Sequence, residues 1–197
     1  MRVIAGKFRS RALHSAPGNS LRPTADRLRE TLFNVLTAGN PTALEGTIWI
    51  DLYAGTGAVG IEAISRGAQT VYFVDAAAPA ADLIRRNLRS LGIGTGFEVI
   101  KENAARALNA LQARSIAVDF VFLDPPYELA EEYQKTLENL SKSSLWKPES
   151  IVIAEHLKKA DPGEAFGSLG RYRRLEQGDA ALSFYRKKST PSHSIVA

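Results

Sequence analysis

The sequence predicts an α/β fold, with a mostly parallel twisted sheet, helices on both faces and an antiparallel hairpin at the C-terminal end. Short apolar runs alternate with helical stretches, which is typical of a parallel sheet. A glycine-rich turn follows the first apolar run. Near the C-terminus, two β-rich runs are separated only by Gln-Gly-Asp at 177–179, which indicates a hairpin.

The elements follow in order along the chain. Five runs are predicted as strands of the parallel sheet: Thr47–Leu52, Thr70–Asp75, Phe97–Lys101, Val118–Leu123 and Ser150–Glu155. Four helices are expected between them. The first follows the glycine-rich turn and ends at about Ser65, and the other three span Pro79–Leu91, Ala104–Ala113 and Leu129–Leu140. The hairpin strands are expected at Arg171–Glu176 and Ala180–Arg186, where they close one edge of the sheet.

The residues before this core predict a small N-terminal extension over residues 1–40, formed by a short hairpin and a helix. Extended runs at Arg2–Ala5 and Arg9–His14 flank Gly6-Lys7, and the helix is expected to be capped by Thr24. Arg27 and Arg29 lie elsewhere on the turn. The apolar positions recur at helical spacing, so that one face packs inward: Leu28, Leu32, Val35 and Leu36. The main domain is then expected at 41–187, and a disordered polar tail at 188–197.

Positive charge is concentrated in the extension. The chain has 25 Lys and Arg against 21 Asp and Glu, a formal charge of +4. Its first 30 residues carry +5 and the other 167 carry −1, the basic side chains being Arg2, Lys7, Arg9, Arg11, Arg22, Arg27 and Arg29. A basic arm on a nearly neutral body favours an anionic macromolecular partner, and a merely solvated positive face is the alternative.

Composition excludes several classes of protein. Cysteine is absent, which excludes disulfide scaffolds, thiolate zinc sites and cysteine nucleophiles and fits a reducing compartment. There is no apolar run of membrane-spanning length and no signal-peptide core, so we expect a cytoplasmic protein without a membrane partner. The three histidines, His14, His156 and His193, are too scattered to predict a metal site.

The glycine-rich turn predicts an adenosyl ligand. It reads Asp-Leu-Tyr-Ala-Gly-Thr-Gly-Ala-Val-Gly over 51–60, with glycines where a ligand approaches the backbone or the turn requires positive φ: Gly55, Gly57 and Gly60. Asp75 follows Gly55 by 20 residues, at the end of the next strand, where a carboxylate can accept hydrogen bonds from both ribose hydroxyls. A tight turn that binds no ligand is the alternative.

Asp51 favours one adenosyl ligand over another. A carboxylate just before the glycines would repel the pyrophosphate of a nicotinamide cofactor. It suits the ammonium of a methionine moiety, directly or through water, and tolerates a sulfonium. The sequence therefore favours S-adenosyl-L-methionine, and a nicotinamide-dependent reductase stays open as an alternative.

Asp124-Pro125-Pro126-Tyr127 follows the fourth strand and predicts a catalytic loop. Ligands of open α/β sheets bind at this edge. The prolines remove backbone donors, which leaves the Asp124 carboxylate and the Pro125 carbonyl as acceptors for an exocyclic amine of a nucleobase. Such acceptors localise the nitrogen lone pair for attack on a methyl group, and Tyr127 can stack on the base. A plain Pro-Pro turn is the alternative.

These motifs resemble class I S-adenosylmethionine-dependent methyltransferases that act on exocyclic amines. More narrowly, the chain resembles the RsmD family of bacterial 16S ribosomal RNA guanine-N2 methyltransferases, over about residues 2–187. The specific match is Leu21–Leu36, which fits LRPT-x-DR-x-RE-x-LFN-x-L at every fixed position. One departure is Ala77, where the family often has a polar residue, within the alanine-rich segment Ala76–Ala81.

The resemblance implies roles for particular residues. It implies a cofactor site at Asp51, Tyr53, Gly55, Gly57, Asp75, Asn103 and Ala104, and a catalytic loop at Asp124, Pro125, Pro126 and Tyr127. The basic arm would contact RNA through Arg2, Lys7, Arg9, Arg11, Arg22 and Arg27. The implied reaction is methylation of one guanine N2 amine in 16S rRNA, within the small subunit or an assembly intermediate, by a monomeric enzyme.

Other activities remain open at this stage. The same loop occurs in methylases of adenine N6 in DNA or RNA, and a related motif serves protein glutamine methylation. A non-catalytic RNA-binding module is a further alternative, against which the intact Gly55, Gly57, Asp75 and Asp124 argue.

Overall fold

The structure is a computed structural model that describes residues 1–15, 23–126 and 130–188, with the backbone alone for 23–25 and 130. An eight-stranded sheet runs through it in the order β3-β2-β1-β4-β5-β8-β7-β6. Its parallel strands are β1 (Ile48–Leu52), β2 (Thr70–Val74), β3 (Phe97–Ile100), β4 (Val118–Leu123) and β5 (Trp146–Leu157). The antiparallel strands are β6 (Ala165–Phe166), β7 (Leu169–Gln177) and β8 (Ala180–Lys187).

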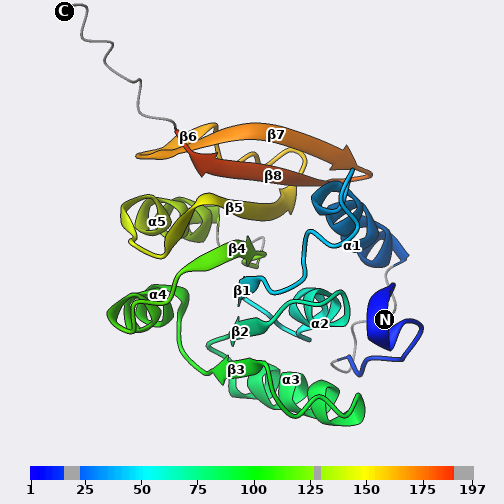
Figure 1. Cartoon of the computed structure of the whole chain (residues 1–197). Coiled ribbons are helices and arrows are strands. Elements are labelled where there is room, and N and C mark those ends of the chain that lie inside the picture. Colours follow the sequence, from blue (N-terminus) through cyan, green and yellow to red (C-terminus); the bar gives the residue numbers. More distant parts are fainter. Residues whose placement is uncertain (16–22, 127–129, 189–197) are drawn as a thin grey trace, which may run out of the picture.

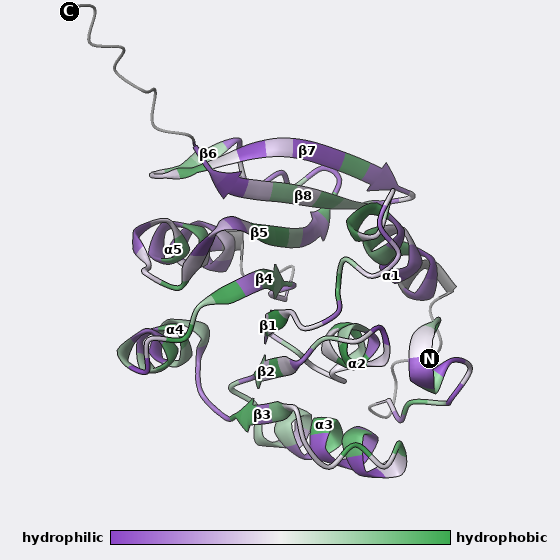
Figure 2. Ribbon diagram, viewed as in Figure 1, coloured by the Kyte–Doolittle hydropathy of each residue, from purple (hydrophilic) through white to green (hydrophobic). Residues whose placement is uncertain are grey.

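Helices cover both faces of the sheet, as expected. Figure 1 shows α1 (Pro23–Leu36), α2 (Ala58–Ser65) and α3 (Ala78–Ser90) on one face, and α4 (Ala104–Ala113) and α5 (Ala130–Lys142) on the other. Each face has its own hydrophobic cluster, because strand side chains alternate between the two faces. The buried strands are mainly hydrophobic, whereas the outer strand β7 is largely hydrophilic (Figure 2). The predicted fold class is confirmed.

The N-terminal extension shares the core of the main domain. Val3, Leu13, Leu28 and Leu32 belong to the same buried cluster as Trp49 of β1. The arm forms a single antiparallel bridge, Arg2 with Ala12, around the short 3₁₀ helix η1 (Gly6–Phe8). It therefore packs onto the body through apolar contacts and leaves Arg2, Lys7, Arg9 and Arg11 at the surface.

Three details differ from the sequence expectation. Helix α1 begins at Pro23, so Thr24 lies within its first turn instead of capping it. Strand β5 begins at Trp146, several residues before the predicted Ser150, and the short strand β6 was not predicted. Within the described residues, no helix is both long and apolar enough to cross a membrane.

Gly60 permits the close approach of α2 to β2 that shapes the glycine loop. A Cβ at this position would lie 2.3 Å from a ring carbon of Phe73 and 2.7 Å from a methyl carbon of Val71. Both partners are fully buried, so neither can move aside easily. Glycine is required here for packing between helix and sheet.

Gly60→Ala is therefore expected to destabilise the fold by roughly 1–3 kcal/mol, as overpacking of a core does. Gly94→Ala is the matched control, because a Cβ there meets nothing within 4 Å. It should change the free energy of unfolding by no more than about 0.5 kcal/mol. Urea unfolding of both variants measures this, and equal stabilities would contradict the packing role of Gly60.

Candidate active site

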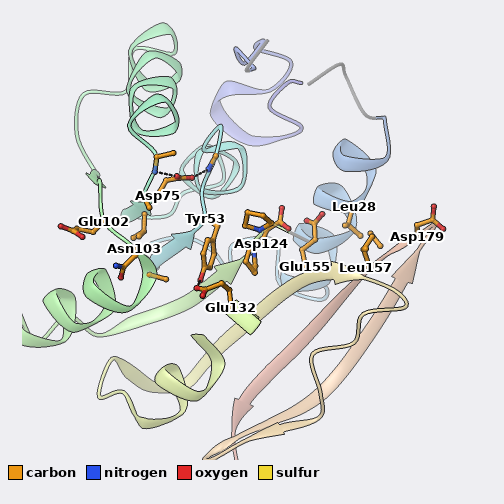
Figure 3. A pocket seen from close by; sticks show the side chains of 18 of the residues that line it. Leu28, Tyr53, Asp75, Glu102, Asn103, Asp124, Glu132, Glu155, Leu157 and Asp179 are labelled. Atoms are coloured by element: carbon orange, nitrogen blue, oxygen red, sulfur yellow. Dashed lines mark hydrogen bonds between the residues drawn. The ribbon is translucent and has the colours of Figure 1, made fainter. Parts of the chain in front are cut away.

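A pocket of about 920 Å³ opens at the carboxyl ends of the parallel strands. The loops after β1, β2, β3 and β4 line it, together with Leu28 of α1 and the turn between β7 and β8. Of the predicted residues, the structure brings together eight in this lining: Tyr53, Gly55, Asp75, Asn103, Ala104, Asp124, Pro125 and Pro126. Figure 3 labels four of them, Tyr53, Asp75, Asn103 and Asp124, around a common hollow.

Asp75 is held rigidly beside the glycine loop. Its Oδ2 accepts a hydrogen bond from the Gly55 amide and its Oδ1 from the Ala77 amide, each at 2.9 Å (Figure 3). Each carboxylate oxygen can accept a second hydrogen bond, which leaves capacity for two ribose hydroxyls. The Ala77 contact comes from the backbone, so the alanine at that position does not remove it.

The glycines of the loop serve different purposes. Gly55 has φ +53° and lines the pocket, and a Cβ there would have only the Tyr53 carbonyl oxygen, 3.9 Å away, within 4 Å. Gly57, with φ +75°, does not line the pocket. It precedes α2, and its Cβ would press on Ile84 at 3.2 Å. Gly55 therefore leaves room for a ligand, whereas Gly57 forms the turn.

Asp51 lies behind the loop and does not line the pocket. It is buried, and its Oδ2 accepts a hydrogen bond of 2.9 Å from the Gly60 amide at the start of α2. Burial raises the pKa of Asp51 to about 8, with the Gly60 bond opposing the shift and the charges of Asp124 and Asp75 adding to it. Asp51 fixes the loop to the helix, and with this pKa it is largely protonated at neutral pH.

Asn103 begins α4 at the far end of the pocket. Its side-chain oxygen accepts a hydrogen bond of 2.9 Å from the Arg106 amide, which caps the helix. The amide nitrogen of the same side chain is left to donate toward the pocket, where it can meet the edge of a purine ring.

Tyr53 connects the glycine loop to α5. Its φ of +58° is uncommon for a bulky residue, and its hydroxyl lies 2.8 Å from Thr136 Oγ1 and 3.2 Å from Glu132 Oε2. Burial raises the pKa of Tyr53 to about 12, so the hydroxyl stays protonated and can donate to Glu132. Sequence reasoning missed Glu132, because nothing local shows that α5 reaches the loop.

Asp124, Pro125 and Pro126 follow β4 and form the middle of the pocket wall. Burial raises the pKa of Asp124 to about 7. Glu155 of β5 lies next to it in the lining (Figure 3), and sequence reasoning assigned it no role. Tyr127, the predicted stacking residue, lies outside the described residues.

The described lining is strongly acidic. It contains six carboxylates and no lysine, arginine or histidine, the acidic residues being Asp75, Glu102, Asp124, Glu132, Glu155 and Asp179. Such a pocket attracts cations and repels phosphates. Among the residues described, no cluster of three His, Asp or Glu side chains could hold a metal ion.

The basic arm is anchored to the body by a buried carboxylate. Glu62 of α2 is fully buried and accepts hydrogen bonds from the amides of Ile4 (2.7 Å) and Ala5 (2.9 Å) and from Arg66 Nε (2.8 Å). Asn87 of α3 bonds both the amide and the carbonyl of His14, and also the Thr56 carbonyl of the glycine loop. Asn87 thus connects the arm to the loop that forms the pocket.

The predicted RNA-contacting residues are exposed where the structure describes them: Arg2, Lys7, Arg9, Arg11 and Arg27. Arg22 lies outside the described residues. Arg29, counted in the basic surface, is instead only 4% exposed. Its Nη2 donates to the Arg2 carbonyl at 2.6 Å and to Asp26 Oδ1 at 3.0 Å, so its charge points into the protein.

The sheet order, the glycine loop after β1 and the acidic residue after β2 define the class I methyltransferase fold. A solved Escherichia coli protein, provisionally described as a methyltransferase, has this fold, with a TM-score of 0.80 at 24% identity and coverage of 96% of this chain and 99% of that one. A hypothetical protein of Thermus thermophilus matches with a TM-score of 0.77 at 26% identity, covering 93% and 98%.

Sequence comparison identifies the family. The family model described as Conserved hypothetical protein 95 matches residues 1–186. The Escherichia coli K12 protein named Ribosomal RNA small subunit methyltransferase D is 35% identical over 191 residues, covering 96% of this chain and 91% of that protein. Its namesake in Haemophilus influenzae is 34% identical over 158 residues, covering 79% and 78%. The chain belongs to this family, the RsmD family, as its motifs indicated.

Proposed function

We propose that the protein transfers a methyl group from S-adenosyl-L-methionine to the exocyclic N2 amine of a guanine in 16S ribosomal RNA. The observation that carries the proposal is the acidic pocket, in which Asp75 follows β2 and Asp124 follows β4, on either side of the central strand β1. Asp75 suits a ribose, and Asp124 suits an amine. A ligand and a nucleobase can therefore meet between them.

The charge of the pocket favours S-adenosylmethionine over a nicotinamide cofactor. When bound, S-adenosylmethionine supplies a methyl group on a cationic sulfonium and also carries an ammonium. Asp75 would hold its ribose, Asn103 would reach its adenine, and the lining carboxylates around Asp124 would favour its positive charges. The pyrophosphate of a nicotinamide cofactor would face the same carboxylates unfavourably.

Asp124 and the Pro125 carbonyl supply the acceptors for the substrate amine. Two acceptors on its N–H groups localise the nitrogen lone pair toward the methyl carbon. As the N–C bond forms, the C–S bond breaks with its electron pair left on sulfur, and N2 loses one proton. Because burial raises the pKa of Asp124 to about 7, its carboxylate can take up that proton at neutral pH and release it to solvent.

Two observations support an rRNA substrate. Relatives that align over most of their length are named ribosomal RNA small subunit methyltransferases, and the chain spans nearly all of the Escherichia coli one. The exposed basic side chains of the arm provide phosphate contacts, which supply affinity and position without reading sequence. The arm is attached to the glycine loop, so RNA held there lies beside the pocket.

The direct test is transfer of labelled methyl from S-adenosylmethionine to small subunits, or their assembly intermediates, from a strain that lacks the enzyme. Nucleoside analysis should place the label in N2-methylguanosine. Label in N6-methyladenosine would favour the adenine alternative, and label in protein would favour glutamine methylation. Either result contradicts the proposal.

Asp75→Ala should weaken binding of S-adenosylmethionine and of its demethylated product by about 10- to 150-fold, the effect of losing a charged hydrogen bond. Asp82→Ala is the control, because Asp82 is an exposed carboxylate of α3 whose side chain contacts Arg85. Calorimetry should show unchanged affinity in the control. Unchanged affinity in Asp75→Ala would remove the ribose role of Asp75.

Asp124→Ala should slow methyl transfer by roughly 10²–10³-fold, as loss of one preorganised group in a transition state does, and should weaken cofactor binding by no more than about tenfold. Asp124→Asn retains an accepting oxygen but not the negative charge. If orientation of the amine dominates, it should keep more activity than Asp124→Ala. If the negative charge is essential, the two variants should be equally slow. Single-turnover rates on small subunits decide this. An Asp124→Ala variant as fast as the parent excludes the loop from the mechanism.

The double variant Lys7→Ala/Arg9→Ala should flatten the salt dependence of RNA binding by roughly one to two units on a log–log plot. Lys142→Ala/Arg106→Ala removes the same charge from exposed positions on α5 and α4, across the sheet from the arm. That control should leave the slope unchanged. Equal slopes for both double variants, measured by filter binding, would contradict an RNA role for the arm.

A further inference from the structure

Glu155 is placed beside Asp124 by the register of the sheet. Leu123 of β4 pairs with Ala154 of β5 in parallel, so Asp124 and Glu155 occupy the next matching positions. Paired residues on neighbouring parallel strands lie about 4.8 Å apart and point to the same face. Both carboxylates line the pocket, and Figure 3 shows them side by side.

The surroundings hold the backbone of Glu155 while leaving its carboxylate to the pocket. The Tyr133 hydroxyl donates to the Glu155 carbonyl at 2.7 Å and lies 3.4 Å from the Pro125 carbonyl, so it connects the two strand ends. No hydrogen bond joins the Glu155 carboxylate to another side chain or amide of the described residues. Its acceptor capacity is available to a ligand.

Arg29 provides a countercharge for this carboxylate. Burial and the charge of Asp124 raise the pKa of Glu155 well above its ordinary range, and the Arg29 guanidinium opposes that shift. Arg29 is buried, and its Nε has no hydrogen-bond partner among the described residues. Its location in α1, next to the pocket residue Leu28, gives the family signature at Leu21–Leu36 a role in the charge balance of the pocket.

We propose that Glu155 determines the specificity for guanine by accepting the N1–H of the target base, while Asp124 and the Pro125 carbonyl hold its 2-amino group. Guanine presents two adjacent donors on this edge, N1–H and N2–H, which match two adjacent carboxylates. Adenine and cytosine present a ring-nitrogen acceptor next to their amine. When Glu155 is ionised, the form that the Arg29 guanidinium favours, that lone pair would face its carboxylate without a proton between them.

The proposal rests on the proposed function and can be tested separately from it. The modified guanosine is first located in the product of the wild-type enzyme. Small subunits are then reconstituted with 2-aminopurine at that position, which keeps the purine ring and the 2-amino group but lacks O6 and has an acceptor at N1. A site built to bind an N–H rejects an analogue that lacks it, so wild-type enzyme should methylate 2-aminopurine at least roughly 10³-fold more slowly than guanine.

Glu155→Gln should reduce the ratio of the rate on guanine to the rate on 2-aminopurine to about tenfold. The reason is that a glutamine amide can either accept from N1–H or donate to an unprotonated N1. Its rate on guanine should fall, and its affinity for S-adenosylmethionine, measured by calorimetry, should stay close to that of the parent. Glu132→Gln removes a different pocket carboxylate, the one near the Tyr53 hydroxyl, and should keep the wild-type ratio.

Two results would overturn the proposal. One is equal wild-type rates on guanine and 2-aminopurine, which needs no variant and so does not depend on folding of Glu155→Gln. The other is a Glu155→Gln variant that keeps the full ratio. If the wild-type enzyme forms no N2-methylguanosine at all, the proposed function itself fails, so the two failures are distinguishable.

Discussion

Mutual repulsion of carboxylates at one edge of the sheet is the constraint on which the architecture of this site depends. Asp51, Asp75, Asp124 and Glu155 come from four neighbouring strands of the sheet or the residues directly after them. Asp51, Asp75 and Glu155 each have a specific compensation. Backbone amides bond Asp51 and Asp75, and the buried charge of Arg29 acts on Glu155. One of these amides, that of Gly55, belongs to a residue with positive φ.

The compensation is incomplete, and this makes the pocket selective. Burial raises the pKa of Asp124 to about 7, which shows that its charge lacks a strong partner within the protein. A cationic ligand and a base with two adjacent N–H donors together supply the positive charge and the hydrogen bonds that these carboxylates lack within the protein. Binding of the methyl donor and recognition of the acceptor are then two consequences of the same negative charge.

Much of the fold could be predicted because its signals are local. Periodicity and strand length placed α4 and β4 at the observed residues, and the glycine spacing located the ligand loop. Glu155 and Glu132 could not be identified in this way, because strand order and helix placement bring them to the pocket from distant parts of the chain. One signal was present for Glu155: it is an acidic residue that follows an apolar strand, as Asp124 is.

Arg29 shows a further limit of sequence reasoning. By composition it belongs to the basic arm, and by helical position it lies off the most apolar stripe of α1. Packing of the arm through Val3 and Leu13 nevertheless buries it, and its guanidinium donates to the Arg2 carbonyl and to Asp26. Whether Arg29 lies at the surface or in the interior depends here on its contact with Arg2, 27 residues earlier in the chain.

The central claim is that the negative charge of the pocket selects the sulfonium of the methyl donor. Calorimetric affinities for S-adenosylmethionine and S-adenosylhomocysteine between about pH 5.5 and about pH 8.5 test it most directly, because the two ligands differ in the methyl group and its charge. As pH rises through about 7 and Asp124 ionises, affinity for S-adenosylmethionine should rise relative to S-adenosylhomocysteine, which lacks the sulfonium charge, on the order of threefold to tenfold. Asp124→Asn should flatten this dependence. An affinity ratio that stays constant with pH, or that rises as pH falls, would contradict the account.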